Sequence, residues 1–369
     1  MNILIAADYA TPASGNFIAS CVELGRALKK SNNTLTFIFP ENNNTISKDS
    51  WVHWLEREGF KVYLTPKDKP DNQNPTFLQS IIKTHQIDIL HIHFGMFQHT
   101  IMKYAKELGV KLLIHDHMDF PAGCNLTKER TRCIVYSLLY RKNKIAIASV
   151  NPHKNSAYIF TKHWYIPNGL SLIRNISKSA TKEETRAKLK INDNEKICLF
   201  LGWDYYRKGL DIAIKAVNKV RKIDPNVVLG VVGFGNAPGE DCLRFISEKT
   251  GIEPNTPWVR YFPSCEDMFA YHRAADVYIS ASRSEAFSYG ILEAISQNTP
   301  IVVSNIKGTS WCHKYNKLFT YPTENADACA DEIMKALSLG RSKSNADEIV
   351  EDFSIEKWCS QMLEIYKSL

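Results

Sequence analysis

The chain has 369 residues, of which 44% are hydrophobic and 23% are charged, and its formal net charge is +7. This length favours two domains over one, and the composition is that of a globular protein rather than a disordered one. The sequence has no run of 18 or more apolar residues, and its first residues lack the pattern of a signal peptide, so we expect neither a membrane-spanning helix nor secretion.

Apolar, β-branched runs alternate with helical patterns from the first residues onward. The first series predicts strands at 3–7, 35–39, 62–64, 87–91, 111–115 and 145–149, with helices at 17–30, 76–84 and 101–108. The second series predicts strands at 197–201, 227–232, 258–262, 277–280 and 300–303, with helices at 209–222, 265–273, 291–297 and 326–339.

This alternation predicts an α/β protein with two doubly wound, Rossmann-like domains that face each other across a cleft. We place the first domain at 1–165 and the second at 166–347, with the turn signal Pro167-Asn168-Gly169 near the junction. Apolar residues at helical spacing within 348–369 predict an amphipathic final helix, which we expect to cross back and pack on the first domain.

Two glutamates, Glu285 and Glu293, lie eight positions apart around a predicted helix start. A helix N-terminus offers unpaired N–H groups and partial positive charge, which suit a diphosphate. A carboxylate farther into the helix can accept hydrogen bonds from sugar hydroxyls. The pattern therefore indicates a site for a nucleoside diphosphate carrying a sugar. The alternative is a capped helix, with Ser284 or Ser288 as N-cap.

Further polar clusters follow predicted strands. Arg207 and Lys208 come after strand 197–201 and directly before a helix, where they could stabilise a departing diphosphate; the alternative is a solvated loop. Gly233 and Gly235 follow strand 227–232 and would allow close approach of a ligand, although a tight turn has the same pattern. In parallel sheets, ligands bind beyond the carboxyl ends of the strands.

Four histidines end two strands of the first series: His91, His93, His115 and His117. They raise the question of a metal site, but no cysteine or carboxylate clearly completes a ligand set, and the nine dispersed cysteines lack metal-binding spacing and suit a reducing compartment. We predict no metal, a polar role in the cleft for His115, and structural roles for His91 and His117.

The loop after the first strand contains Gly15 and Asn16 and then begins a helix. Its small residues are typical of an anion or sugar site, but it lacks the G-x-G-x-x-G fingerprint of dinucleotide-binding proteins.

Taken in order, these motifs resemble those of the family 4 glycosyltransferases, which are retaining enzymes with the GT-B fold. The resemblance runs along most of the chain. It rests on Asp88-Ile89-Leu90-His91-Ile92-His93, His115-Asp116, Ile166-Pro167-Asn168-Gly169, Arg207-Lys208-Gly209, Val232-Gly233-Phe234-Gly235, Ala275-Asp276-Val277, the two spaced glutamates, and Pro300-Ile301-Val302-Val303-Ser304.

The resemblance implies a role for each candidate residue. Glu293 would hold the ribose hydroxyls, Glu285 would contact the donor sugar, and Lys208 would neutralise the leaving diphosphate. His115 would line the sugar site near the anomeric centre. The other donor-binding positions are Phe287, Ser288, Tyr289, Gly15, Asn16, Gly233 and Gly235.

Trp203 stands where the family commonly has arginine, and Arg207, four residues on, is the candidate replacement for the missing guanidinium. The glycine pair often found in the first loop is reduced to Gly15.

The resemblance further implies retaining transfer from a nucleotide-sugar donor, with UDP favoured over GDP, to a saccharide or lipid-linked acceptor in cell-surface polysaccharide biosynthesis. It implies no cofactor, no metal and no nucleic-acid partner. The alternatives are another GT-B enzyme, such as a nucleotide-sugar epimerase or a phosphorylase, and a non-catalytic GT-B partner subunit.

A basic segment suggests an anionic membrane surface as a further partner. Cationic residues surround the apolar run 133–140, and such a segment can dock on a bilayer: Lys128, Arg130, Arg132, Arg141, Lys142 and Lys144. The alternative is an ordinary surface helix. The expected location is therefore cytoplasmic, with peripheral attachment to the inner face of the cell membrane as an option.

Overall fold

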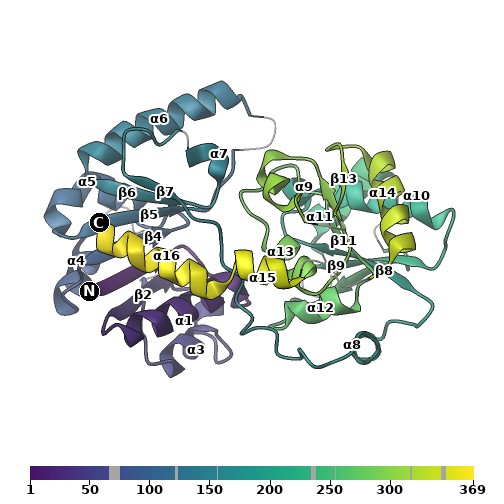
Figure 1. Cartoon of the computed structure of the whole chain (residues 1–369), viewed down its shortest axis with the longest axis horizontal. Coiled ribbons are helices and arrows are strands. Elements are labelled where there is room, and N and C mark those ends of the chain that lie inside the picture. The colour runs from purple at the N-terminus through teal and green to yellow at the C-terminus, as the bar shows by residue number, and fades with distance from the viewer. Residues whose placement is uncertain are drawn as a thin grey trace. The chain divides into compact units, whose positions relative to one another are not determined.

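The protein folds into two α/β units, as the computed structural model in Figure 1 shows. Unit 1 comprises Met1–Ser171 together with Phe353–Leu369, and unit 2 comprises Leu172–Asp352. The structure describes residues 1–65, 75–120, 124–155, 157–233, 238–253, 255–315, 318–341 and 346–369.

Unit 1 is built on a seven-stranded sheet in the order β3-β2-β1-β4-β5-β6-β7, in which every pairing is parallel. The five inner strands carry continuous buried runs, as expected for a parallel sheet covered on both faces, whereas the edge strands β3 and β7 are mostly half-buried. The strands are β1 (Asn2–Ala7), β2 (Thr34–Pro40), β3 (Lys61–Thr65), β4 (Ile89–His93), β5 (Lys111–Asp116), β6 (Ile145–Ser149) and β7 (His163–Tyr165).

The helices of unit 1 surround this sheet (Figure 1). They are α1 (Gly15–Lys30), α2 (Asn43–Ile46), α3 (Val52–Arg57), α4 (Pro75–Thr84), α5 (Gln98–Leu108), α6 (Leu126–Lys142), α7 (Pro152–Asn155) and α16 (Ile355–Ser368).

The final helix α16 belongs to unit 1, where it packs against α1. Ser354 begins this helix, because its hydroxyl accepts a hydrogen bond from the backbone N–H of Lys357 at 3.2 Å. The face toward the unit 1 core buries Trp358, Met362 and Tyr366.

Unit 2 is built on a six-stranded parallel sheet in the order β10-β9-β8-β11-β12-β13. The strands are β8 (Lys196–Leu201), β9 (Val227–Val232), β10 (Val259–Phe262), β11 (Val277–Ser280), β12 (Ile301–Ser304) and β13 (Leu318–Tyr321). The helices are α8 (Lys182–Lys188), α9 (Tyr205–Lys208), α10 (Leu210–Arg221), α11 (Glu240–Thr250), α12 (Met268–Ala274), α13 (Tyr289–Ser296), α14 (Ala326–Leu339) and α15 (Ala346–Asp352), with a 3₁₀ helix at Lys307–Cys312.

The strand order of each sheet reverses at one point, and such a point is where ligands bind in doubly wound folds. In unit 1 the reversal falls between β1 and β4, and in unit 2 it falls between β8 and β11. The motifs of the sequence follow these same strands. The topology therefore brings the polar loops of each unit to the carboxyl edge of its own sheet.

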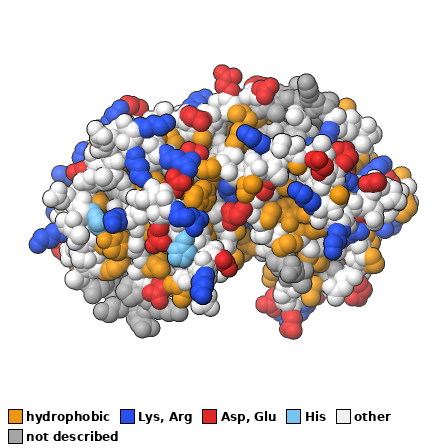
Figure 2. Space-filling model, turned by 90° about the horizontal axis from the view of Figure 1, so that it is seen from below, with side chains coloured by type: hydrophobic (Ala, Val, Ile, Leu, Met, Phe, Trp, Pro, Cys, Tyr) orange, Lys and Arg blue, Asp and Glu red, His pale blue; other side chains and the backbone are white. Residues whose placement is uncertain are grey.

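Among the described residues, no helix is both long and apolar enough to cross a membrane. On the face shown in Figure 2, lysine and arginine side chains are interspersed with acidic and apolar ones. The net positive charge is therefore not gathered into one stripe on that face.

Candidate functional site

Two loops of unit 2 meet beyond the neighbouring strands β8 and β11. The backbone N–H of Arg283 donates to the carbonyl oxygen of Arg207 at 2.7 Å, which joins them. Gly209 lies between α9 and α10 with φ +74°, and a Cβ there would lie 2.1 Å from the carbonyl oxygen of Ala281. Only glycine permits both this backbone conformation and this approach. It places the loop of Arg207 and Lys208 beside the loop of Glu285.

Glu285 lies between two cations. The Lys208 ammonium donates to Glu285 Oε1, and Arg207 Nη1 lies 3.6 Å from Glu285 Oε2. The Ser282 hydroxyl also donates to Oε1 at 2.9 Å, and the Glu285 residue is only 5% exposed. A carboxylate buried to this extent requires such partners, because desolvation of an unpaired charge is costly.

The short helix α9 orients Arg207. Asp204 is its N-cap, with Oδ1 accepting from the Arg207 backbone N–H at 3.1 Å and Oδ2 accepting from Arg207 Nε at 2.9 Å. Arg207 Nη1 donates in addition to the carbonyl oxygen of Ser284 at 3.2 Å. The guanidinium is thereby held at the carboxylate of Glu285. Trp203, at the start of the same loop, is 71% exposed.

Helix α13 begins beside this cluster. Ser288 is its N-cap residue, with extended backbone and no side-chain capping bond, and the first turn contains no acidic residue. The N–H groups of this turn and their partial positive charge are consistent with an anion site. The ring of Phe287 stacks on Trp311 with centroids 4.5 Å apart, which fixes the approach to the helix. Tyr289 is partly exposed at the first helical position.

Glu293 lies in the second turn of α13 and is 3% exposed. Its Oε2 lies 3.4 Å from Nε2 of His272, a fully buried residue on α12. Tyr278, on β11, has its pKa raised above its usual value by burial and then by the charges of Glu285 and Glu293. A Cβ on Gly290 would lie 2.4 Å from the Tyr278 hydroxyl, so this glycine makes room for the tyrosine.

Gly233 directly follows β9, the strand next to β8. Its φ is +126°, and a Cβ there would lie 2.8 Å from the carbonyl carbon of Gly202. The two glycine-containing strand ends are therefore in close backbone contact. Gly235 lies outside the described residues.

In unit 1 the four histidines form one cluster at the carboxyl ends of β4 and β5, in which His91, His93 and His115 are buried and His117 is half-buried. His91 Nδ1 lies 2.8 Å from the Tyr366 hydroxyl of α16, and His93 Nδ1 lies 2.8 Å from His117 Nε2. The His115 ring stacks on His117 with centroids 4.4 Å apart and is 1% exposed.

Burial lowers the pKa of all four rings: to about 3 for His91, to about 4 for His117, and well below the usual value for His93 and His115. The imidazoles are therefore neutral at pH 7. Within the described part of the chain, neither ring nitrogen of His115 has a hydrogen-bond partner.

Neutral imidazoles are the metal-binding form, and one nitrogen from each of His91, His93 and His115 lies within 4.8 Å of the others. Ligands of a tetrahedral zinc ion, at about 2.0–2.1 Å from the metal, would lie about 3.3 Å apart. The prediction of no metal remains a prediction.

Gly15 and Asn16 begin α1 at the same edge of unit 1. Gly15 has φ +58°, and a Cβ there would lie 2.3 Å from the Tyr9 hydroxyl, which donates to the carbonyl oxygen of Ser14 at 2.9 Å. Phe17 links this loop to the histidines, with its ring centroid 4.9 Å from that of His93.

The structure thus gathers the predicted residues into one set per unit. Arg207, Lys208 and Glu285 are in direct contact in unit 2, with Gly233 and α13 beside them. Three contributors were missed from the sequence: Asp204, Tyr278 and His272. Asp204 stands three residues before Arg207, a capping spacing that could have been recognised. Tyr278 and His272 lie within apolar strand and helix patterns and gave no such signal.

Comparison with known proteins bears on this arrangement. A family model described as "Glycosyltransferase Family 4" matches residues 19–169, and one described as "Glycosyl transferases group 1" matches residues 181–352. The chain belongs to glycosyltransferase family 4. The two matches cover most of both units, in agreement with the sequence resemblance.

Curated relatives of this family 4 member match over part of their length. The alpha-monoglucosyldiacylglycerol synthase of Streptococcus pneumoniae is 31% identical over 238 residues, which is 60% of this chain and 53% of that protein. The chain spans about half of the length of that relative, and similar or smaller shares of others.

Solved structures agree over the whole chain. A glycosyltransferase from Rickettsia africae ESF-5 has a TM-score of 0.77 at 19% identity, covering 100% of this chain and 98% of that one. The Anabaena protein Alr3699/HepE in complex with UDP-glucose has a TM-score of 0.76 at 16% identity, covering 100% of both chains. These matches confirm the GT-B fold.

Proposed function

We propose that the protein is a retaining glycosyltransferase that moves a sugar from a nucleotide-diphosphate-sugar donor to a saccharide or lipid-linked acceptor. The observation that carries the proposal is the contact of Glu285 with both Lys208 and Arg207 beside the N-terminus of α13. Two cations and a helix start supply positive charge for a diphosphate, while two buried carboxylates can accept hydrogen bonds from hydroxyl groups.

On the donor side, the backbone amides of Phe287, Ser288 and Tyr289 bind the diphosphate, and Glu293 binds the ribose hydroxyls. Glu285 contacts the donor sugar. Lys208 and Arg207 are paired with Glu285 in the free protein, so a bound diphosphate competes with that carboxylate for them. Arg207 takes the place of the arginine that the family commonly has at the position of Trp203.

In the reaction, the bond between the anomeric carbon and the β-phosphate oxygen breaks, and the acceptor oxygen bonds to that carbon from the same face. The acceptor proton passes to the departing phosphate oxygen, which balances the step without a metal. Lys208, Arg207 and the helix terminus stabilise the charge that grows on the diphosphate. Because burial lowers the pKa of His115 and keeps its ring neutral, the role proposed for it is hydrogen bonding rather than charge.

The donor nucleotide is uridine diphosphate in this proposal. Support comes from Anabaena Alr3699/HepE, a structural neighbour solved with UDP-glucose, with UDP and glucose, and with UDP. The acceptor class follows from relatives such as the alpha-monoglucosyldiacylglycerol synthase and the lipopolysaccharide glucosyltransferase WaaG of Escherichia coli. Their names favour a role in making cell-surface glycans or glycolipids.

A peripheral membrane contact through α6 belongs to the same proposal. Large apolar side chains are exposed along this helix, among cationic ones: Leu126, Val135, Leu138 and Leu139. A flotation assay with anionic vesicles tests the contact. Salt-sensitive binding that Leu138→Ser with Leu139→Ser abolishes supports it, and no binding at low salt rules it out.

The donor site is tested by thermal shift with UDP and GDP on the wild type, Glu293→Gln and the exposed control Glu248→Gln. We expect UDP to stabilise the wild type and the control, and Glu293→Gln to weaken UDP binding about tenfold or more, because a charge-assisted hydrogen bond contributes about 1.5–3 kcal/mol. Equal UDP binding by Glu293→Gln and wild type would contradict the assignment.

A further inference from the structure

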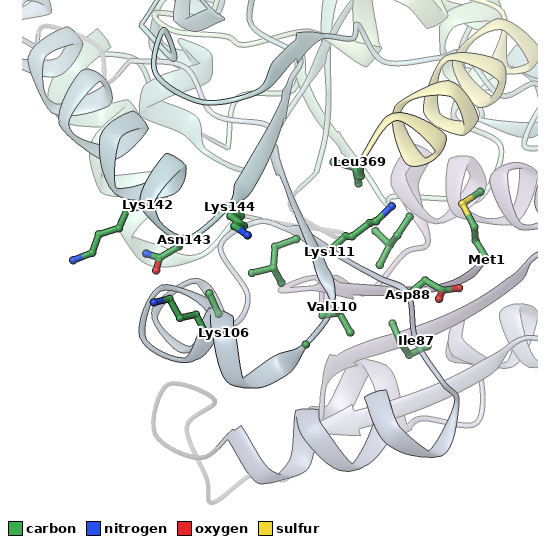
Figure 3. Close-up of a pocket in the computed structure, with 14 residues that line it drawn as sticks. Met1, Ile87, Asp88, Lys106, Val110, Lys111, Lys142, Asn143, Lys144 and Leu369 are labelled. Carbon is green, nitrogen blue, oxygen red and sulfur yellow. The ribbon is translucent and has the colours of Figure 1, made fainter.

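A cavity of about 850 Å³ lies in unit 1 where β4 and β5 begin (Figure 3). Ile89 and Lys111, the first residues of these strands, line it, whereas His93 and Asp116 are the last residues. A strand of five residues spans roughly 13 Å, so the cavity opens at the opposite edge of the sheet from the histidine cluster. Its volume is within the range of small-molecule sites.

The inner wall of this cavity is apolar. Ile87, Ile89 and Leu112 come from the start of the sheet and Ala105 from α5, and each is at most 8% exposed. Val110 completes the wall in the turn before β5. This wall would favour contact with hydrocarbon over contact with a free inorganic anion, because burial of apolar surface is favourable.

The rim of the cavity is cationic. Lys106, Lys111, Lys142 and Lys144 line it, and within the described chain none of the four forms a salt bridge. In Figure 3, Lys106 and Lys142 lie on one side, with Lys144 and Lys111 nearer the middle. Asp88 is the one acidic side chain among the lining residues, and its carboxylate already accepts from the Asn2 N–H at 2.7 Å.

Four unpaired ammonium groups above an apolar wall are complementary to an anionic amphiphile. The surface next to the cavity indicates which one. Lys142 ends α6, the helix that exposes Val135, Leu138 and Leu139 together with cationic side chains. We propose that this lysine-rimmed cavity binds the phosphate headgroup of an anionic phospholipid, with the adjoining part of the lipid against the apolar wall.

The site adds a specific lipid-binding position to the membrane contact proposed for α6, and it is separate from the candidate donor site. The test uses the full chain and dihexanoyl phosphatidic acid below its micelle concentration, with binding measured by calorimetry in the absence of any sugar donor. A failed transferase assay therefore leaves this result standing. We expect one lipid per chain, and at least tenfold weaker binding of dihexanoyl phosphatidylcholine and of inorganic phosphate.

Two variants probe the two halves of the site. Lys111→Gln with Lys144→Gln removes charge from exposed positions, and Val110→Trp fills the cavity while leaving all four lysines. Each should weaken phosphatidic acid binding at least tenfold. The matched control, Lys48→Gln with Lys83→Gln, removes two exposed lysines of the same unit elsewhere and should bind as the wild type does.

Three outcomes would overturn the proposal. Wild-type affinity in Lys111→Gln with Lys144→Gln would show that the rim does not bind the headgroup. An equal loss in the control pair would show diffuse attraction to net charge. Inorganic phosphate binding as tightly as the lipid, with the same lysine dependence, would make this a free-phosphate site.

Discussion

Lys208 and Glu285 form an ion pair before any donor is bound. Lys208 is the residue expected to neutralise the leaving diphosphate, and Glu285 is the one expected to contact the donor sugar. Each neutralises the other in a buried setting, which keeps both in place at a modest electrostatic cost. A diphosphate brings more negative charge than one carboxylate and would draw Lys208 toward it. Under the proposed function, the diphosphate would replace Glu285 as the partner of Lys208.

Replacing Lys208 tests this role. Lys208→Ala should lower kcat about 10²- to 10³-fold, as the loss of one preorganised donor to a developing charge typically does, with a smaller effect on donor KM. Initial rates with saturating acceptor measure both. Lys215→Ala, an exposed lysine on α10, is the control. Undiminished kcat in Lys208→Ala would show that Arg207 carries the charge alone.

Gly209 offers a second residue-scale test, of stability rather than rate. Gly209→Ala combines a left-handed backbone with a Cβ 2.1 Å from the Ala281 carbonyl oxygen, so the loops must separate. Gly251 has a similar φ of +65° with open space around it, and Gly251→Ala should cost only about 1–2 kcal/mol. Urea unfolding should show a clearly larger loss for Gly209→Ala. Equal losses would mean that the loop contact is not rigid.

At the scale of elements, the alternation of strands and helices was predictable, because parallel strands are read from continuous apolar runs. The first and last residues of the strands were less predictable. β4 runs from Ile89 to His93 rather than over 87–91, since a fully buried strand has no alternation to mark its start. Its bounds come from pairing, with Ile3 opposite Ile89 and Ala7 opposite His93. The edge strands β7 and β13 were missed because neither carries a continuous buried apolar run.

The histidine-bearing ends of β4 and β5 predict a pH dependence of stability. Folded pKa values of about 3 for His91 and about 4 for His117 lie below the unfolded value of about 6.5. Below pH 6.5 the unfolded chain therefore binds protons that the folded chain does not, and the unfolding free energy falls as pH falls. Above pH 6.5, these two histidines do not change the unfolding free energy.

Urea unfolding at pH 7.5, 6.5 and 5.5 measures this slope. His117→Gln removes one such group and should reduce the slope by up to about 1.4 kcal/mol per pH unit. The exposed His53→Gln is the control for loss of any imidazole. A slope that is the same in His117→Gln and in the wild type would contradict the burial argument.

At the scale of the whole molecule, each unit has its own core and its own set of candidate residues. The sequence motifs predicted both sets because family spacing and strand order agree. They could not predict the partners that hold the sets in place. Tyr278 near both glutamates, and Tyr366 beside His91, come from positions that a sequence pattern assigns to the core.

Amide hydrogen exchange with and without UDP tests which of the two units binds the nucleotide. Slower exchange is expected at 203–209 and 286–292, the loops around Lys208 and the start of α13, because bound ligand suppresses local opening. Exchange in α11 should not change. Protection confined to unit 1 would place the nucleotide in the wrong unit for the proposed mechanism.

The return of α16 to unit 1 has a consequence for synthesis. Unit 2 is complete once Asp352 has emerged, whereas unit 1 still lacks the helix that covers His91 and packs on α1. A ribosome adds about 5–20 residues per second. During synthesis of unit 2, part of the apolar surface of unit 1 therefore stays uncovered. The first unit to be translated is therefore the last to be finished, and the nascent chain passes through a stage in which chaperone binding would favour its N-terminal half.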